Sequence, residues 1–184
     1  MTLAASVEGR ERLRLFCALT LPDEAIDELV RWQREDLASE ARALGRDHLH
    51  VTLAFLGHRP AEEVDPIART LRESAAAASQ IVLSPRRYRE TRSVGMLVLD
   101  DEEGRAAALA GDLHERLERL GVYEREKRPW LPHVTVLRFK RPPGLAPPLP
   151  GLGAFSPSGA ALYHSVLRSG GAQYEVLESV ALGG

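Results

Sequence analysis

The chain has 184 residues, of which 44% are hydrophobic and 27% are charged, and its formal net charge at pH 7 is -2. This size and composition suit one compact domain over residues 1–184, and the near-neutral charge excludes a protein that attracts nucleic acid or an anionic membrane through its overall field. The single cysteine, Cys17, excludes an internal disulfide, and no segment approaches the roughly 20 apolar residues of a membrane span.

The first half of the chain predicts a strand, a helix, a second strand and a second helix. Residues 1–14 lack an apolar stretch of signal-peptide length, so we expect a cytoplasmic protein with no membrane partner. An apolar run over 13–19 predicts the first strand, and the capping-box spacing of Thr20 and Asp23 predicts a helix after Pro22. Residues 48–57 are β-branched and apolar enough for a strand, and helical spacing returns after Pro60.

The second half predicts two strands, a helix, a further strand and a closing hairpin. Residues 81–83 and 94–99 read as strands joined by an arginine-rich connection over 86–92. A leucine stripe predicts a helix over 103–120, which Gly121 ends. A strand is expected from Pro132 to Phe139, a Pro/Gly connection over 142–153, and a hairpin between 162–167 and 174–182.

The two halves repeat one order of elements: an apolar strand, an amphipathic helix, and a strand that carries histidine-x-threonine. Leu15 precedes His50 by 35 residues, and Val98 precedes His133 by 35 residues. This repetition indicates an internal duplication, and packing about a pseudo-two-fold axis would make equivalent strands face each other. The two histidine-threonine pairs could then line one cleft.

The repeated strands have the residue types of an acid/base site for phosphate esters. Side chains two positions apart share one face of a strand, so His50 with Thr52, and His133 with Thr135, each present an imidazole beside a hydroxyl. One histidine can accept a proton while the other donates one, and threonine hydroxyls can bind phosphate oxygens. A single histidine-x-threonine would mean little, but two copies in equivalent places favour function.

The segments 49–57 and 132–138, which read LHVTLAFLG and PHVTVLR, resemble the paired signature of the two-histidine phosphoesterase superfamily. They are most similar to its RNA 2',3'-cyclic phosphodiesterase branch, also called the 2'-5' RNA ligase family. The opening segment 14–19 and the closing segments 162–167 and 171–177 are also similar to that branch, so the resemblance spans nearly the whole chain.

The resemblance implies a bilobal α+β fold, in which antiparallel sheets face a central cleft and the helices lie outside. It also implies hydrolysis of a terminal 2',3'-cyclic phosphate to a 2'-phosphate without metal or other cofactor, with reversible 2'-5' RNA ligase activity as a further reaction. It makes His50 the proton donor to the 3' oxygen, His133 the proton acceptor that activates water, and Thr52 and Thr135 phosphate ligands. The residues alone leave the order of acid and base open. The expected partner is RNA with a 2',3'-cyclic phosphate end or a small cyclic nucleotide, bound by a monomer.

Several other polar residues could take part. Arg138 matches a basic position of the branch, but its strand parity is opposite to that of His133, so it reaches the phosphate only if the strand twists or bulges. His48 could tune His50 or could be a solvated strand-end histidine. Trp130 and Tyr88 could stack a base or pack in the core. The basic residues that could follow an RNA backbone are Arg86, Arg87, Arg89, Arg92, Arg125, Lys127, Arg128, Lys140 and Arg141.

Two alternatives remain open. A zinc-dependent hydrolase could use His48 and His50 as ligands on one strand face, but the sequence offers no obvious carboxylate ligand near either motif. A non-catalytic module could bind RNA ends in the same cleft, although binding alone could use arginine or lysine in place of histidine.

Overall fold

The computed structural model describes residues 11–37 and 41–183, so the N-terminal residues 1–10 of the expected domain lie outside the described part. Within these ranges no helix is long and apolar enough to cross a membrane. The elements, in chain order, are β1 (Arg12–Thr20), α1 (Asp23–Glu35), β2 (Arg42–Ala43), η1 (Arg46–His48), β3 (Val51–Pro60), η2 (Ala61–Glu63), α2 (Val64–Ala77), β4 (Ser84–Glu90), β5 (Val94–Asp100), α3 (Arg105–Arg119), β6 (His133–Arg138), β7 (Gly159–Arg168) and β8 (Gly171–Val180).

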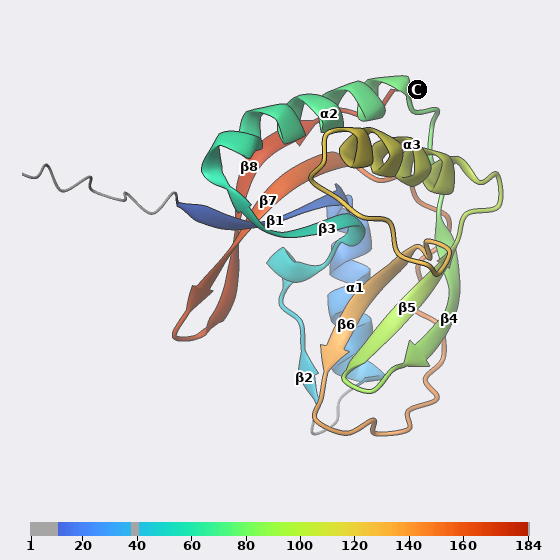
Figure 1. Cartoon of the computed structure of the whole chain (residues 1–184). Coiled ribbons are helices and arrows are strands. Elements are labelled where there is room, and N and C mark those ends of the chain that lie inside the picture. The colour runs from blue at the N-terminus through green and yellow to red at the C-terminus, as the bar shows by residue number, and fades with distance from the viewer. Residues whose placement is uncertain (1–10, 38–40, 184) are drawn as a thin grey trace, which may run out of the picture.

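The strands form one continuous antiparallel sheet in the order β4-β5-β6-β3-β1-β7-β8, with the short β2 paired to β6 (Figure 1). The two halves of this sheet meet at β3 and β6, which share a single pair, Val51 with Val134. A contact this short leaves the two groups of strands free to diverge on either side of the seam. The sheet therefore consists of two lobes joined at one point, and the histidine-x-threonine segments lie at that point.

The repeated order of elements is present as β1-α1-β3 and β5-α3-β6. Leu15 and Val98, which both lie 35 residues before a histidine, are not at equivalent positions in the sheet. The residue that pairs with the valine of the motif is Leu19 for Val51 and Leu97 for Val134. The connections between the paired strands differ in length, so equal sequence spacing and equal register do not coincide.

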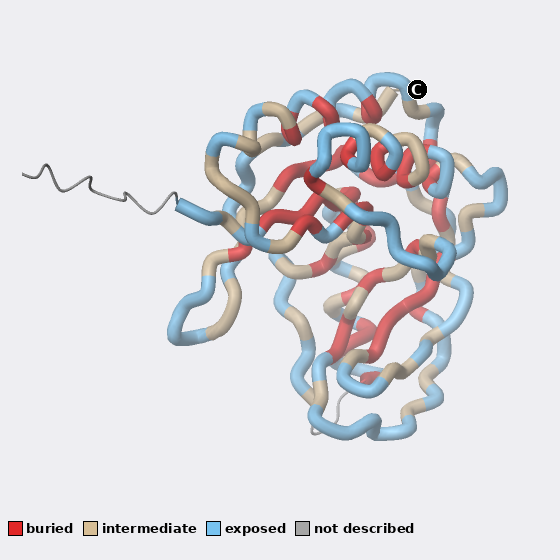
Figure 2. Tube along the Cα trace, in the orientation of Figure 1, coloured by how far each residue is buried: buried red, intermediate tan, exposed pale blue. Residues whose placement is uncertain are grey.

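The helices pack on the face of the sheet that lies away from the histidines. α2 and α3 contact each other, α2 contacts β7 and β8, and α3 contacts β3. The buried residues gather between these two helices and the sheet and along β5 and β6 (Figure 2). This arrangement confirms the expected α+β fold with antiparallel strands and outer helices.

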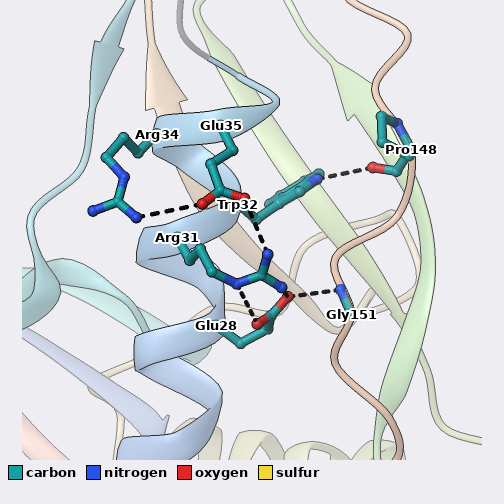
Figure 3. A network of polar contacts seen from close by, with 7 residues as sticks. All are labelled: Glu28, Arg31, Trp32, Arg34, Glu35, Pro148 and Gly151. Carbon is teal, nitrogen blue, oxygen red and sulfur yellow. Dashed lines mark hydrogen bonds and ion pairs between the residues drawn. The ribbon is translucent and has the colours of Figure 1, made fainter.

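Helix α1 is tied to the Pro/Gly connection over 142–153 (Figure 3). The indole Nε1 of Trp32 donates to the carbonyl of Pro148 at 2.8 Å, and the backbone N–H of Gly151 donates to the carboxylate of Glu28 at 2.7 Å. Arg31 forms ion pairs with Glu28 and with Glu35. These contacts hold the connection over 142–153, which has no helix or strand, against α1.

The capping box expected at Thr20 and Asp23 is wrong. α1 begins at Asp23 as expected, but Pro22 is its N-cap and no side chain caps it. The carbonyl of Pro22 accepts the N–H groups of Ala25 and Ile26. Thr20 is still paired in β1, and its hydroxyl bonds with that of Ser158, so it is not available to the helix.

The expected strand over 81–83 is also misplaced, because β4 covers most of the arginine-rich segment that was expected to be a connection. β4 is the outermost strand and pairs only with β5. Edge strands commonly carry charged side chains, which discourage pairing with other chains. Before β4 the chain buries Ile81 and Leu83 but leaves Val82 exposed, and Leu83 forms an isolated bridge with Phe155.

Candidate active site

The pairing of β3 with β6 places the two histidine-x-threonine segments side by side. Because the strands are antiparallel and Val51 lies opposite Val134, His50 is next to Thr135, and Thr52 is next to His133. Both valines are fully buried, whereas the histidines and threonines are partly exposed. All four polar side chains line one cleft of about 570 Å³.

Each motif is followed by a bulge. Thr52 and Ala54 pair with consecutive residues of β1, so Leu53 is an extra residue, and Val136 is extra against β5 in the same way. The two bulge carbonyls accept hydrogen bonds from buried side chains: His114 Nε2 of α3 donates to Leu53 at 2.6 Å, and Gln33 Nε2 of α1 donates to Val136 at 2.8 Å. Each half of the protein therefore supports the motif of the other half through its helix.

The bulges change which side chains reach the cleft. A bulge reverses the alternation of a strand beyond it, so Arg138 lies on the same side as His133 and lines the cleft. This is the condition under which Arg138 was expected to reach a phosphate. Phe55, which follows the bulge of β3, lines the cleft for the same reason.

His50 lies among aromatic rings. Its ring stacks on Phe16, with centroids 5.1 Å apart, and meets the edge of Tyr174 at 5.7 Å. Its Nε2 is 3.1 Å from the hydroxyl of Thr52. Burial lowers the pKa of His50 to about 4, because desolvation outweighs the hydrogen bond to the His48 backbone, and repulsion from His48 and His133 acts in the same direction. His50 is therefore neutral near pH 7 in this structure.

His133 is oriented by the chain that precedes β6. Its Nδ1 is 2.8 Å from the carbonyl of Leu131. Because a carbonyl can only accept, Nδ1 carries the proton, and the neutral ring has its lone pair on Nε2. The ring lines the cleft, so Nε2 is the nitrogen available for proton transfer.

His48 is in the short helix η1 and not on the strand that was expected to carry it. Its ring lines the cleft and packs against the edge of Tyr174, with centroids 4.6 Å apart, so it is not a solvated strand end. Across 11–37 and 41–183 no three His, Cys, Asp or Glu side chains are grouped as metal ligands. Within these residues the zinc alternative therefore lacks a third ligand for His48 and His50.

The cleft contains arginines that the sequence did not single out. Arg42 of β2 lies directly opposite Arg138 in the ladder, and Arg14 of β1 lines the same cleft. None of these three arginines forms an ion pair with a carboxylate of the described residues. Arg42 and Arg138 are like charges placed opposite each other, which destabilises a sheet. The alternation of β1 could have indicated Arg14 and Phe16, but no sequence signal marked Arg42.

The other basic and aromatic candidates lie outside the cleft. None of the nine basic residues over 86–141 that could follow an RNA backbone lines it. Arg86 pairs with Asp100, and Arg125 pairs with Glu118. Tyr88 packs against Trp32, and the indole of Trp130 donates to the carbonyl of Thr52 at 3.0 Å, so Trp130 helps to hold the first motif.

Comparisons with known proteins identify the family of this chain. The family model described as the 2'-5' RNA ligase superfamily matches residues 21–170. The chain is similar to RNA 2',3'-cyclic phosphodiesterase of Escherichia coli, with 29% identity over 175 residues, which cover 94% of this chain and 98% of the relative. It is 31% identical to RNA 2',3'-cyclic phosphodiesterase of Thermus thermophilus, covering 94% of this chain and 91% of that protein.

Solved structures give the same result. E. coli LigT in complex with NADP+ superposes with a TM-score of 0.82 at 28% identity, covering 95% of this chain and 99% of that chain. The structure of the same protein with 3'-AMP also gives 0.82, at 27% identity, over 94% of this chain and 99% of that chain. Sequence and fold thus agree over nearly the full length, and the chain belongs to the 2'-5' RNA ligase superfamily.

Proposed function

We propose that this enzyme, a hydrolase of phosphodiester bonds, is an RNA 2',3'-cyclic phosphodiesterase that opens a terminal 2',3'-cyclic phosphate to a 2'-phosphate. The observation that carries the proposal is the single pair of Val51 with Val134, which sets two imidazole-hydroxyl pairs next to each other in one cleft. The names of the E. coli and T. thermophilus relatives support the substrate. With a 5'-hydroxyl in place of water, the same attack would form a 2'-5' linkage, so the proposal includes 2'-5' RNA ligase activity.

The proposed reaction is an in-line displacement at phosphorus. His133, with its lone pair on Nε2, accepts a proton from water as the water oxygen bonds to phosphorus. The bond from phosphorus to the 3' oxygen breaks, and His50 donates a proton to that oxygen. The 2' oxygen keeps the phosphate, and solvent returns the two histidines to their starting protonation states.

The phosphate itself would be held by hydroxyls and guanidinium groups. The hydroxyls of Thr52 and Thr135 donate to non-bridging oxygens, and Arg138, with Arg42 opposite it, offsets their negative charge. A bound anion also raises the pKa of a nearby imidazole. His50, whose pKa is lowered by burial, would therefore take up its proton when the substrate binds.

The test uses a short RNA with a 2',3'-cyclic phosphate end, assayed in EDTA. The product is identified by phosphorus NMR and by its resistance to a phosphatase that removes only 3'-phosphates. We expect one product, the 2'-phosphate, and a loss of about 100-fold to 10,000-fold in kcat for His50→Ala and for His133→Ala. Thr52→Ala and Thr135→Ala should lose less.

The matched control is His58→Ala, which removes an exposed histidine of β3 that does not line the cleft. A mainly 3'-phosphate product would overturn the assignment of donor and acceptor. Tight binding of the RNA without turnover would favour the non-catalytic module, and activity lost in EDTA and restored by zinc would favour the metallohydrolase.

A further inference from the structure

The cleft has an aromatic and basic end that the phosphate chemistry does not use. Arg14 of β1 and Phe55 of β3 both line the cleft, and the guanidinium of Arg14 lies over the ring of Phe55, 5.0 Å from its centroid. Phe55 is 49% exposed, which is unusual for a large apolar side chain on a central strand. Neither residue contacts the histidines in any described interaction.

The backbone of β1 and β3 turns both side chains toward the cleft. Alternation along β1 puts Arg14 on the same side as Phe16, while Leu15 between them is fully buried. On β3 the bulge at Leu53 turns Phe55 to the cleft, and a second bulge at Leu56 follows it. Without the bulge at Leu53, Phe55 would alternate into the core, so the exposed ring depends on this irregularity of β3.

The charge of Arg14 is also uncompensated. Among residues 11–37 and 41–183 it forms no ion pair with a carboxylate, and its described partner is the Phe55 ring. A guanidinium whose face lies on a ring keeps its N–H edge free to donate to phosphate oxygens. An aromatic ring or a guanidinium plane is the surface on which unpaired RNA bases stack.

The position relative to the reacting phosphate matters. Phe55 lies three residues beyond Thr52 on β3, which is about 10 Å along a strand. That is too far for the terminal cyclic phosphate held by Thr52, but within the length of the neighbouring nucleotide.

We propose that Arg14 and Phe55 form a subsite for the nucleotide on the 5' side of the cyclic-phosphate end. The base stacks on the Arg14–Phe55 pair, and the edge of the guanidinium binds the phosphodiester that joins the last two nucleotides. This inference rests on the proposed function and names its substrate class: an oligonucleotide is preferred over a cyclic mononucleotide.

The experiment compares kcat/KM for a trinucleotide with a 2',3'-cyclic phosphate end and for the matching cyclic mononucleotide. We expect the wild-type enzyme to prefer the trinucleotide, and Phe55→Ala or Arg14→Ala to reduce that preference about tenfold. Phe55→Tyr, which keeps the ring, should retain it. Arg14→Ala should also reduce the dependence of log kcat/KM on log salt concentration by about 0.7 for the trinucleotide, as expected for one lost phosphate contact.

Two control variants lie elsewhere on the surface: Arg69→Ala on α2 and Val82→Ala, whose side chain is 46% exposed. Both should keep the wild-type preference. A preference that is the same in Phe55→Ala and in the wild type would overturn the proposal, as would equal losses on both substrates, which would mean that the pair serves the terminal nucleotide. If the wild type turns over neither substrate, the proposed function fails. The subsite is then tested by binding of the trinucleotide, measured by fluorescence anisotropy. Equal affinities of the wild type and Phe55→Ala would overturn it.

Discussion

Replacing His50 with glutamine should make the protein more resistant to acid. In the folded protein burial holds the pKa of His50 at about 4, whereas in the unfolded chain it returns to the ordinary 6.5. Between these two values the unfolded state binds more protons than the folded state, so the free energy of unfolding falls as the pH drops from 6.5 to 4. The stability linked to His50 is complete above pH 6.5 and is lost on the way to pH 4.

The size of the effect follows from the difference between the two pKa values. The free energy of unfolding linked to His50 is about 3 kcal/mol in full, and the part of it lost between pH 7 and pH 5 is about 2 kcal/mol. The wild-type protein should therefore lose about 2 kcal/mol more over this interval than His50→Gln, in which every other titrating group is kept.

Urea unfolding followed by circular dichroism at pH 7, 6 and 5 gives these free energies directly. His58→Gln is the control, because it makes the same substitution at an exposed histidine of β3 that does not line the cleft. Parallel loss of stability in the wild type and in His50→Gln would refute the reasoning, since it would mean that the aromatic surroundings of His50 do not disfavour its charged form.

Three further outcomes are expected. Gln33→Leu and His114→Leu each remove the side-chain donor of a buried bulge carbonyl, so each should lower the free energy of unfolding by about 1–3 kcal/mol in urea titrations. Each should also lower kcat, because the bulge follows a motif. A loss of stability with unchanged kcat would show that the bulges do not position the motifs. Arg42→Ala should raise KM several-fold with little change in kcat. It should also raise Tm slightly, because it relieves the repulsion between Arg42 and Arg138. A lower Tm would contradict this account. Dialysis against EDTA should leave turnover within about twofold of its starting value, and steady-state assays before and after dialysis check this.

Local patterns in the sequence were enough to predict most of the elements and the four polar residues of the two motifs. Alternation in a strand and the 3.6-residue period of a helix depend only on neighbours in the chain. For this reason the strand that begins directly after His50, the strand that carries His133, the helix after Pro22 and the closing hairpin were predicted correctly. The two histidine-x-threonine segments could be recognised as a pair because each contains its chemistry within three residues.

The tertiary structure decided which other side chains share the cleft with them. A bulge exists only relative to a neighbouring strand, so the side on which Arg138 or Phe55 lies depends on the ladder with β5 or β1 and not on the parity of the residue number. Arg42 reaches the cleft because a two-residue strand pairs with β6, and a strand this short has no periodicity. The sequence by itself thus indicated the four residues proposed to act on the phosphate, while the pairing of strands distant in sequence determined the cations and rings that surround them.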